Sequence, residues 1–600
     1  MPLGLSYISK ILRNLKQETS PFDLEFFFRR DDPSLIYKIN SLFGYPAHDP
    51  KRIMFLIRPE LVLYALFPYA YRASFIPAKP NQINIIDAIR TRLNSYIKTI
   101  LKEHFDLILF SVYVSNIAIS LMAAQLIKRM SSAPIIFGGP GISLPELYRF
   151  VMGTRFVDGC VIGEGEDTIS DLIKIFSSDL NYIRIPGFVS SDLKGNFIPR
   201  PLISPLDSIP LPCFDDFPAK GYNLSAYFIS GKNTHIPIST SRGCIMKCSF
   251  CSETQFWKTF RQRSVESVFD ELDSQTKKHR ISFIRFNDSL LNANVEWLEE
   301  LCDQIISREL KIKWVDTFFR PCGIDKKLAL KMRRAGCEGI QLGIETGSSE
   351  MRGKLKKGTK DEDIASILKN MNCSGIHVVA NILTGFPNES LDDFMENMRF
   401  ISKTVMSNDK SCCLPGSYLR IEPYSDLYKN PQRYGIKIVP FNIRLPDEID
   451  FLQRHISDIT WAWTDSISWS EKKLRCRILN SFIKICQPDM SKRFPYDNIP
   501  PEAIENSSIF KCANKELVTI LRDEEGEYII LYVDHVITRL SYKEYQILSI
   551  INERPRSTKE IFMHVKSQVD CGSTLSEIKS LLIKFLSLSP FPLIAFQETT

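Results

Sequence analysis

The stretch Thr240-Ser241-Arg242-Gly243-Cys244-Ile245-Met246-Lys247-Cys248-Ser249-Phe250-Cys251 decides how the rest of this sequence is interpreted. Its three cysteines follow the spacing Cys-x3-Cys-x2-Cys, which supplies three thiolates from one loop and no fourth. Three thiolates suit a [4Fe–4S] cluster that keeps one iron open, and an open iron can bind a substrate or a cofactor. The spacing therefore predicts a catalytic iron–sulfur centre held by Cys244, Cys248 and Cys251.

Two other uses of these cysteines stay open. A structural zinc site usually takes four ligands, often as two Cys-x2-Cys pairs, whereas the other close cysteines, Cys412 and Cys413, are adjacent. A disulfide framework needs an oxidising compartment, and the 15 cysteines of this chain show no evident pairing scheme. Because the first residues also lack the apolar run of a signal peptide, we expect a cytoplasmic protein.

At this loop the chain resembles the radical S-adenosylmethionine (SAM) enzymes, which carry an aromatic residue just before the third cysteine, here Phe250. In that family the open iron is chelated by SAM. One electron then cleaves SAM to a 5′-deoxyadenosyl radical, which abstracts a hydrogen atom from the substrate. The resemblance implies SAM as a cofactor, and an electron donor of the flavodoxin or ferredoxin type as a partner.

The length of 600 residues exceeds what one hydrophobic core supports, so several domains are expected. A hydrophobic fraction of 44% with 24% charged residues is ordinary for a globular protein, and a net charge of +7 is too small to indicate nucleic-acid binding. We predict an α/β fold class with an N-terminal extension (1–50), a first α/β domain (51–200), a proline-rich linker (201–235), a second α/β domain (236–430), a helical segment (431–505) and a C-terminal domain (506–600).

Short apolar strands alternate with helices from residue 52 to about residue 187, which predicts a doubly wound, Rossmann-like sheet. One uncharged stretch, 107–127, is long enough to cross a bilayer. It divides into a buried strand and a capped helix, so no membrane span is expected. The expected strands are 53–57, 83–86, 107–110, 135–137 and 157–162, with a helix over 117–130.

Two glycine-rich turns follow strands of this first domain, Gly138-Gly139-Pro140-Gly141 and Gly163-Glu164-Gly165-Glu166. Loops at the carboxyl ends of strands hold the ligand in open α/β sheets, although any Rossmann-like sheet has such turns. With residues 106–116, they resemble the cobalamin-binding domain that precedes many radical SAM domains. The Asp-x-His-x-x-Gly pattern of other cobalamin proteins is absent. The resemblance implies cobalamin as a cofactor, contacted by Ser111, Asn116, Gly138, Gly139, Gly163 and Glu164.

Strands and helices alternate again over residues 236–424, which matches the partial (β/α) barrel of the radical SAM family. Three of the expected strands end in polar residues, within 283–288, 339–347 and 382–389. Active sites in such barrels lie at the carboxyl ends of the strands. These three segments resemble family motifs that surround SAM.

Carried over to this sequence, the resemblance places Asp288 and Glu345 at the methionine or ribose of SAM, and Gly385 and Pro387 at its adenine. A carboxylate can accept two ribose hydroxyls or pair with an ammonium group. Asp288 could instead cap a helix, and Glu345 could instead form a buried ion pair.

Basic residues outside these motifs have simpler interpretations. Arg261 and Arg263, just after the cysteine loop, either pair with acids or phosphate or lie on a solvated face. Residues 445–490 are expected to be helical, with aromatic side chains in the core. Four basic residues there are expected to form a solvated helix face: Lys472, Lys473, Arg475 and Arg477.

The last 95 residues predict a hairpin, 517–522 and 528–533, followed by three helices, which is a winged-helix plan. The pattern resembles PqqD-like domains, the leader-peptide recognition elements of ribosomal peptide maturation. It implies a precursor peptide that binds as an added β-strand. The helices lack a dense basic face, so DNA is not expected as a partner. The three helices are expected at 541–552, 558–568 and 574–586.

Together these features predict a cobalamin-dependent radical SAM enzyme. The expected reaction is methylation of an unactivated carbon in a ribosomally synthesised peptide (RiPP) precursor or another natural product. The same radical could instead drive cyclisation, rearrangement or epimerisation. An iron–sulfur regulator that binds DNA through the C-terminal domain is an alternative from another class, which the retained motifs at 288, 345 and 385 disfavour. No acid–base residue is assigned.

Overall fold

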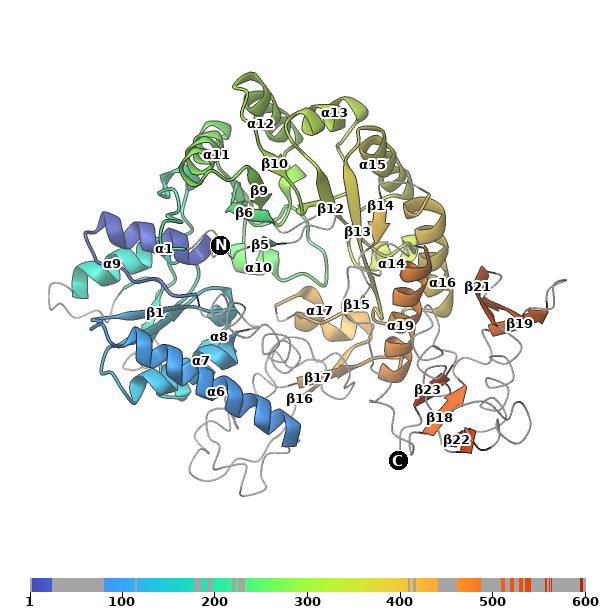
Figure 1. Cartoon of the computed structure of the whole chain (residues 1–600), viewed down its shortest axis with the longest axis horizontal. Coiled ribbons are helices and arrows are strands. Elements are labelled where there is room, and N and C mark those ends of the chain that lie inside the picture. The colour runs from blue at the N-terminus through green and yellow to red at the C-terminus, as the bar shows by residue number, and fades with distance from the viewer. Residues whose placement is uncertain are drawn as a thin grey trace. The chain divides into compact units, whose positions relative to one another are not determined.

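The structure is a computed structural model, drawn in Figure 1. It divides into two compact units, the first made of Met1–Gly343, Gly353–Val378 and Arg420–Ser466, and the second of Ile344–Arg352, Val379–Leu419 and Ile467–Thr600. The residues that it describes are 3–23, 80–113, 116–176, 185–190, 197–217, 223–224, 233–407, 411–413, 417–422, 424–440, 461–486, 509–512, 518–522, 528–532, 535–540, 556–557, 560–561, 563 and 594–596.

The first unit begins with a four-stranded sheet in the order β1-β2-β3-β4. β1 (Ile108–Ser111), β2 (Ile135–Gly138) and β3 (Gly159–Val161) are parallel, and β4 (Phe188–Ser190) pairs antiparallel with β3. The expected strands at 107–110, 135–137 and 157–162 are therefore confirmed. Parallel strands read as continuous apolar runs because both of their faces are covered.

Helices cover both faces of this sheet. Neighbouring side chains of a strand point to opposite faces, so one strand contributes to the cores on both sides. Ile135 and Phe137 of β2 join a core with α6, α7 and α8, while Ile136 between them joins a second core with α9 and α1. The covering helices are α1 (Leu3–Asn14), α6 (Pro80–Ile100), α7 (Ile117–Lys128), α8 (Pro145–Gly153) and α9 (Glu166–Phe176).

The expectation of a strand at 83–86 is wrong, because these residues belong to α6. Ile86, Ile89, Leu93 and Ile97 are buried at intervals of three and four, which is the period of a helix. A short apolar run cannot by itself distinguish a buried strand from one face of a helix. The expected strand at 53–57 lies outside the described residues.

A second set of strands begins at residue 233, and two sheets have the orders β10-β9-β6-β5 and β11-β12-β13-β14, with β15 also on β13. β12 and β13 begin in the first unit and end in the second. Within the first unit, β6, β9 and β10 are parallel, and so are β11 and β12. The strands are β5 (Asn223–Leu224), β6 (Asn233–Ile238), β9 (Phe283–Phe286), β10 (Lys313–Trp314), β11 (Thr317–Phe319), β12 (Gly339–Glu345), β13 (His377–Thr384), β14 (Ser411–Cys413) and β15 (Ser417–Tyr418).

Helices α11, α12 and α13 lie along one side of the first-unit strands, as Figure 1 shows in green. Side-chain caps begin these helices, at Ser264, Asn294 and Asp325 respectively. A cap satisfies a backbone N–H that the first turn of a helix leaves unpaired. The helices are α11 (Val265–His279), α12 (Val295–Ser307), α13 (Lys326–Arg334), α14 (Ser349–Lys354), α15 (Asp361–Cys373), α16 (Leu391–Phe400) and α17 (Asp426–Lys429).

The expected helix over 445–490 is confirmed at α19 (Trp469–Cys486) and wrong at 461–464, while 445–460 and 487–490 lie outside the described residues. Before α19, β17 (Trp461–Thr464) pairs antiparallel with β16 (Lys437–Pro440). The expected solvated face is wrong for Lys472 and Arg475, which are buried in the second unit, while the side chains of Lys473 and Arg477 are not among those described.

The C-terminal hairpin is confirmed. β19 (Val518–Arg522) pairs antiparallel with β20 (Tyr528–Tyr532), which pairs with β21 (His535–Leu540). A second small sheet has the order β22-β18-β23, from Arg556–Ser557, Ile509–Cys512 and Ile594–Phe596. The three helices of the winged-helix prediction lie largely outside the described residues. None of the helices that the structure describes has the length and apolar character needed to cross a membrane.

We predict that His235 makes the fold sensitive to acid. Its ring lies edge-on against Phe283, both ring nitrogens are buried without a hydrogen-bond partner, and burial lowers its pKa to about 4. The unfolded chain binds a proton at His235 near pH 6.5, so folding stability falls as the pH drops from about 6.5 to about 4. Melting temperatures of cluster-free protein at pH 7.5 and pH 5 should differ less for His235→Leu than for the unchanged protein.

The exposed His104 provides the control. His104→Leu should keep the full difference between the two pH values. An equal loss of stability in His235→Leu and the unchanged protein would contradict the prediction.

Candidate functional site

The cysteine loop is closed at its base by a short antiparallel pair. β7 (Ser241–Arg242) precedes the loop, β8 (Arg261–Gln262) follows it, and the two strands pair with each other. Gly243 begins the loop with φ at +90°, and a Cβ atom there would lie 2.6 Å from the carbonyl oxygen of Thr259. Only glycine fits this turn without strain.

The three thiols form a donor set that fits an iron–sulfur cluster. The backbone N–H of Met246 donates to Cys244 Sγ at 3.4 Å, and the backbone N–H of Glu253 donates to Cys251. Burial raises the pKa of Cys244, and it raises the pKa of Cys251 to about 12. Such thiols need the positive charge of bound iron to become thiolates, and the N–H donors then stabilise the negative sulfur.

The alternative of a structural zinc site stays a prediction. Across the described part of the chain, no three His, Cys, Asp or Glu side chains converge closely enough to hold a single metal ion. A structural zinc site draws four ligands around one ion.

Asp288 holds the start of the cysteine loop from the carboxyl end of β9. Its buried carboxylate accepts hydrogen bonds from Thr240 N at 3.1 Å, Thr240 Oγ1 at 2.9 Å and Ser241 Oγ at 2.5 Å. Burial raises its pKa despite these bonds. The alternative that Asp288 caps a helix is wrong, because Asn294 caps α12. Contact of Asp288 with SAM stays a prediction.

In the second unit, the other predicted SAM residues occupy constrained turns. Glu345 ends β12 with φ at +71°, a conformation that non-glycine residues rarely adopt and that often marks a functional site. Gly385 follows β13 with φ at +70°, and a Cβ atom there would lie 3.2 Å from Cβ of Tyr418. Pro387 is buried in the same turn.

Two residues that the sequence reasoning missed hold this turn together. The carboxylate of Glu389 accepts hydrogen bonds at 3.0 Å from Gly385 N and from Thr384 Oγ1. Arg475 of α19 pairs with the same oxygen at 3.2 Å and donates to the Glu389 carbonyl at 2.6 Å. Because both side chains are buried, the pair fixes the shape of the turn.

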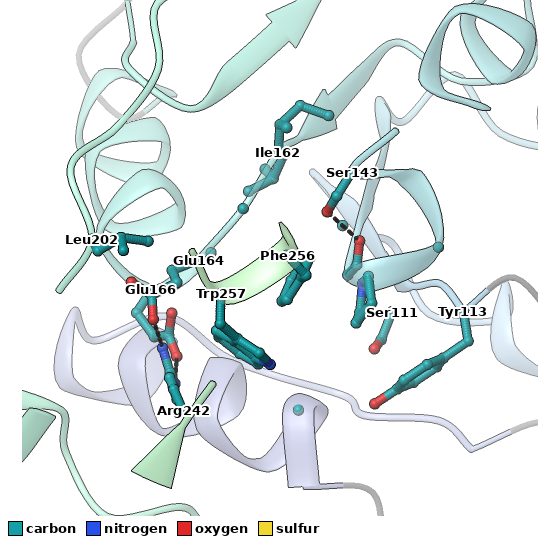
Figure 2. Close-up of a pocket in the computed structure, with 18 of the residues that line it drawn as sticks. Ser111, Tyr113, Ser143, Ile162, Glu164, Glu166, Leu202, Arg242, Phe256 and Trp257 are labelled. Atoms are coloured by element: carbon teal, nitrogen blue, oxygen red, sulfur yellow. Dashed lines mark hydrogen bonds and ion pairs between the residues drawn. The ribbon is translucent and has the colours of Figure 1, made fainter. Parts of the chain in front are cut away.

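Most of the predicted cobalamin residues line one cavity of about 880 Å³ in the first unit, part of which Figure 2 shows. Ser111, Gly138, Gly139, Gly163 and Glu164 all contribute to its wall, at the carboxyl ends of β1, β2 and β3. Asn116 is not part of the wall. Its Oδ1 accepts a hydrogen bond from Tyr113 N at 2.8 Å and so shapes the loop after β1.

Glu164 has a role that the sequence reasoning did not assign. Its buried carboxylate pairs with Arg242 at 2.6 Å and Arg261 at 2.9 Å, and it accepts from Ile203 N at 2.7 Å. Burial opposes ionisation, but the hydrogen bonds from Arg261 and Arg242 outweigh it and lower the pKa of Glu164. Arg242 also pairs with Glu166. The turn after β3 is thus joined to the base of the cysteine loop.

The two arginines after the cysteine loop pair with acids, which was one of the two alternatives open for them. Arg261 pairs with Glu164, and Arg263 pairs with the buried Glu271 of α11.

Aromatic residues of α10 (Glu253–Trp257), directly after the third cysteine, face the cavity. Phe256 and Trp257 pack against each other with ring centroids 4.5 Å apart, and the Arg242 guanidinium lies 5.3 Å from the Trp257 ring. Figure 2 shows both side chains between the β3 turn and Ser111. The position of these residues next to Cys251 was the signal that could have identified them.

Helix α1 completes another part of the wall, although the sequence assigned no purpose to residues 1–50. Leu3, Gly4 and Tyr7 line the cavity. Ser9 Oγ donates to Asp216 at 2.7 Å, Arg13 pairs with the same carboxylate, and Cys213 N donates to Ser6 O at 3.0 Å. These bonds fasten α1 to the linker.

We predict that alanine is tolerated worse at Gly139 than at Gly163. Both glycines have positive φ, which costs a non-glycine residue about 1–2 kcal/mol. At Gly139 the added Cβ would also lie 2.7 Å from the backbone oxygen of Val112, whereas at Gly163 nothing lies within 4 Å. Urea unfolding should show a clearly larger loss of stability for Gly139→Ala than for Gly163→Ala, and equal losses would contradict this geometry.

The sequence of this chain was compared with those of known families and proteins. Residues 238–401 match the model described as the Radical SAM superfamily. An uncharacterized methyltransferase of Pyrococcus horikoshii is 28% identical over 368 residues, which cover 59% of this chain and 75% of that protein. Tryptophan 2-C-methyltransferase of Streptomyces laurentii is 26% identical, with 51% of this chain and 59% of that protein covered.

A solved structure shares the fold. The radical S-adenosylmethionine methyltransferase TsrM from Kitasatospora setae, with cobalamin and a [4Fe–4S] cluster bound, superposes with a TM-score of 0.50 and 18% identity, covering 74% of this chain and 88% of that one. At this identity the likeness concerns the architecture alone.

Proposed function

We propose that the whole chain is a cobalamin-dependent radical SAM methyltransferase, built around the radical SAM domain at residues 238–401. The proposed reaction transfers a methyl group to an unactivated carbon of a peptide, such as a RiPP precursor, or of another natural product. The methyltransferases among its relatives support the reaction type.

The observation that carries this proposal is the cavity of the first unit, to which the glycine turns and the segment after the third cysteine both contribute. Its wall includes the glycine turns after β2 and β3 and also Phe256 and Trp257, which follow the third cysteine. A ligand in this cavity therefore lies against the cysteine-bearing segment. That arrangement suits a methyl carrier that must reach a substrate radical formed near the cluster.

When bound, the cluster and SAM supply the radical chemistry, and cobalamin supplies the methyl group. The chain's own residues hold and orient these groups. Cys244, Cys248 and Cys251 would bind the cluster, and Asp288 fixes the backbone just before them. Glycines at 138, 139 and 163 let the backbone approach a flat ring closely. The aromatic pair of α10 excludes water from the cavity wall.

We also propose that the C-terminal region binds a peptide substrate. β19, β20 and β21 form a three-stranded antiparallel sheet in this order, with β19 and β21 at its edges. An extended leader peptide could add to such an edge by backbone hydrogen bonds. The resemblance to PqqD-like domains supports this part of the proposal, which is independent of the reaction type.

The test uses anaerobically purified protein with a reconstituted cluster, SAM, hydroxocobalamin and a strong reductant. We expect a cobalamin spectrum that stays with the protein on gel filtration, and formation of both 5′-deoxyadenosine and S-adenosylhomocysteine. Cys248→Ala should abolish 5′-deoxyadenosine formation, because two thiolates cannot hold a cluster with one open iron.

Cys373→Ala is the matched control, because Cys373 is exposed and belongs to no predicted site. It should keep the iron content and SAM cleavage of the unchanged protein. Formation of 5′-deoxyadenosine alone would point to cyclisation, rearrangement or epimerisation. Absence of both products, with no difference between the two variants, would overturn the proposal.

A further inference from the structure

The strands of the radical SAM domain in the first unit have an apolar face and a polar face. On β9, Ile284 and Phe286 are fully buried, and Phe286 contacts Trp314 of β10. Because side chains alternate along a strand, Phe283 and Arg285 point to the opposite face. On β11 the same alternation places Thr317 and Phe319 on the apolar face.

A bend in the backbone between β10 and β11 carries an acidic side chain. Asp316 lies between β10 and β11 with φ at +55°, a rare conformation for a residue other than glycine. Backbone strain of this kind clusters at functional sites. Asp316 is only 8% exposed, yet one of its carboxylate oxygens has no hydrogen-bond partner. A buried, unsatisfied carboxylate is costly unless something else satisfies it.

Burial raises the pKa of Asp316, and the positive charge of Arg285 partly offsets that effect. The two do not form an ion pair, and Arg285 makes no hydrogen bond or ion pair with any residue in the described part of the chain. The two segments are adjacent, because Val315 N, just before Asp316, donates to the carbonyl of Ile284, just before Arg285, at 3.3 Å. The guanidinium and the carboxylate are thus both available to a group that satisfies both.

The surroundings of this pair suit an organic ligand. Phe318 of β11 lies on the same face and is 37% exposed, which is unusual for a phenylalanine within a sheet. Its register partner on β12, Gln341, adds a carboxamide that can donate and accept hydrogen bonds. The face thus combines a cation, an anion, an amide and an apolar surface.

We propose that Arg285 and Asp316 bind the α-amino-acid backbone unit of the substrate. Its carbonyl or carboxylate oxygen accepts from the Arg285 guanidinium, its N–H or ammonium group donates to Asp316, and its side chain packs on Phe318. This pattern of adjacent acceptor and donor occurs in a free amino acid and in a peptide. The inference rests on the proposed function only in taking this ligand to be the substrate.

Binding is tested by saturation-transfer NMR on the reconstituted protein with SAM and without reductant. One set of probes contains the proteinogenic L-amino acids, and a second contains their N-acetyl methylamides. At least one probe should bind the unchanged protein, the free form if the substrate is an amino acid and the capped form if it is a peptide. Arg285→Gln and Asp316→Asn should each weaken that binding by about tenfold or more.

Lys277→Gln and Asp303→Asn are charge-matched controls from the exposed faces of α11 and α12, and they should leave probe binding unchanged. Iron content and melting temperature show that each variant is folded. Failure of every probe to bind, or equal binding by the Arg285 and Asp316 variants, would overturn the site. Absence of SAM cleavage with intact, Arg285-dependent probe binding would overturn the proposed function and leave the site standing.

Discussion

The first unit depends on one buried ionic cluster, in which Arg242 and Arg261 meet Glu164 and Glu166. Charges taken out of water are stable only when each is paired and hydrogen-bonded, and removal of one partner from such a pair costs about 3–5 kcal/mol. The cluster therefore fixes the turn after β3 against the base of the cysteine loop. The cavity has its shape because these two segments are not free to separate.

The second unit applies the same constraint on a smaller scale. Glu389 is surrounded by protein, and its negative charge is balanced by Arg475 and by donors from the turn that it holds. In both units a buried carboxylate organises a turn that follows a strand. Rigid backbone of this kind orients a bound group without reorganisation during reaction.

Sequence reasoning succeeded where the signal was local. The strands at 108–111 and 135–138 and the C-terminal hairpin are each contained within a few residues. It failed where partners are distant in sequence. The local sequence around Arg475 predicts a surface residue. Its partner Glu389 lies 86 residues earlier, and only the fold brings the two together.

The predicted site shows the same division. The glycines that line the cavity could be found because a tight turn leaves a signature in the sequence. The second role of Glu164, the pairing of Asp288 with Thr240 and the isolation of Asp316 could not, because each depends on which side chain faces it across the fold. Resemblance to a family supplies positions for cofactors, but it does not indicate which carboxylates are already engaged.

The attachment of α1 has a consequence for the order of assembly. Ser9 and its acceptor Asp216 are 207 residues apart, so α1 cannot dock until the linker has been made. Contacts of such long sequence separation form late, since loop closure must precede them. Until α1 docks, the part of the cavity wall that Leu3, Gly4 and Tyr7 supply is missing. The cavity is therefore complete only after the linker has been made.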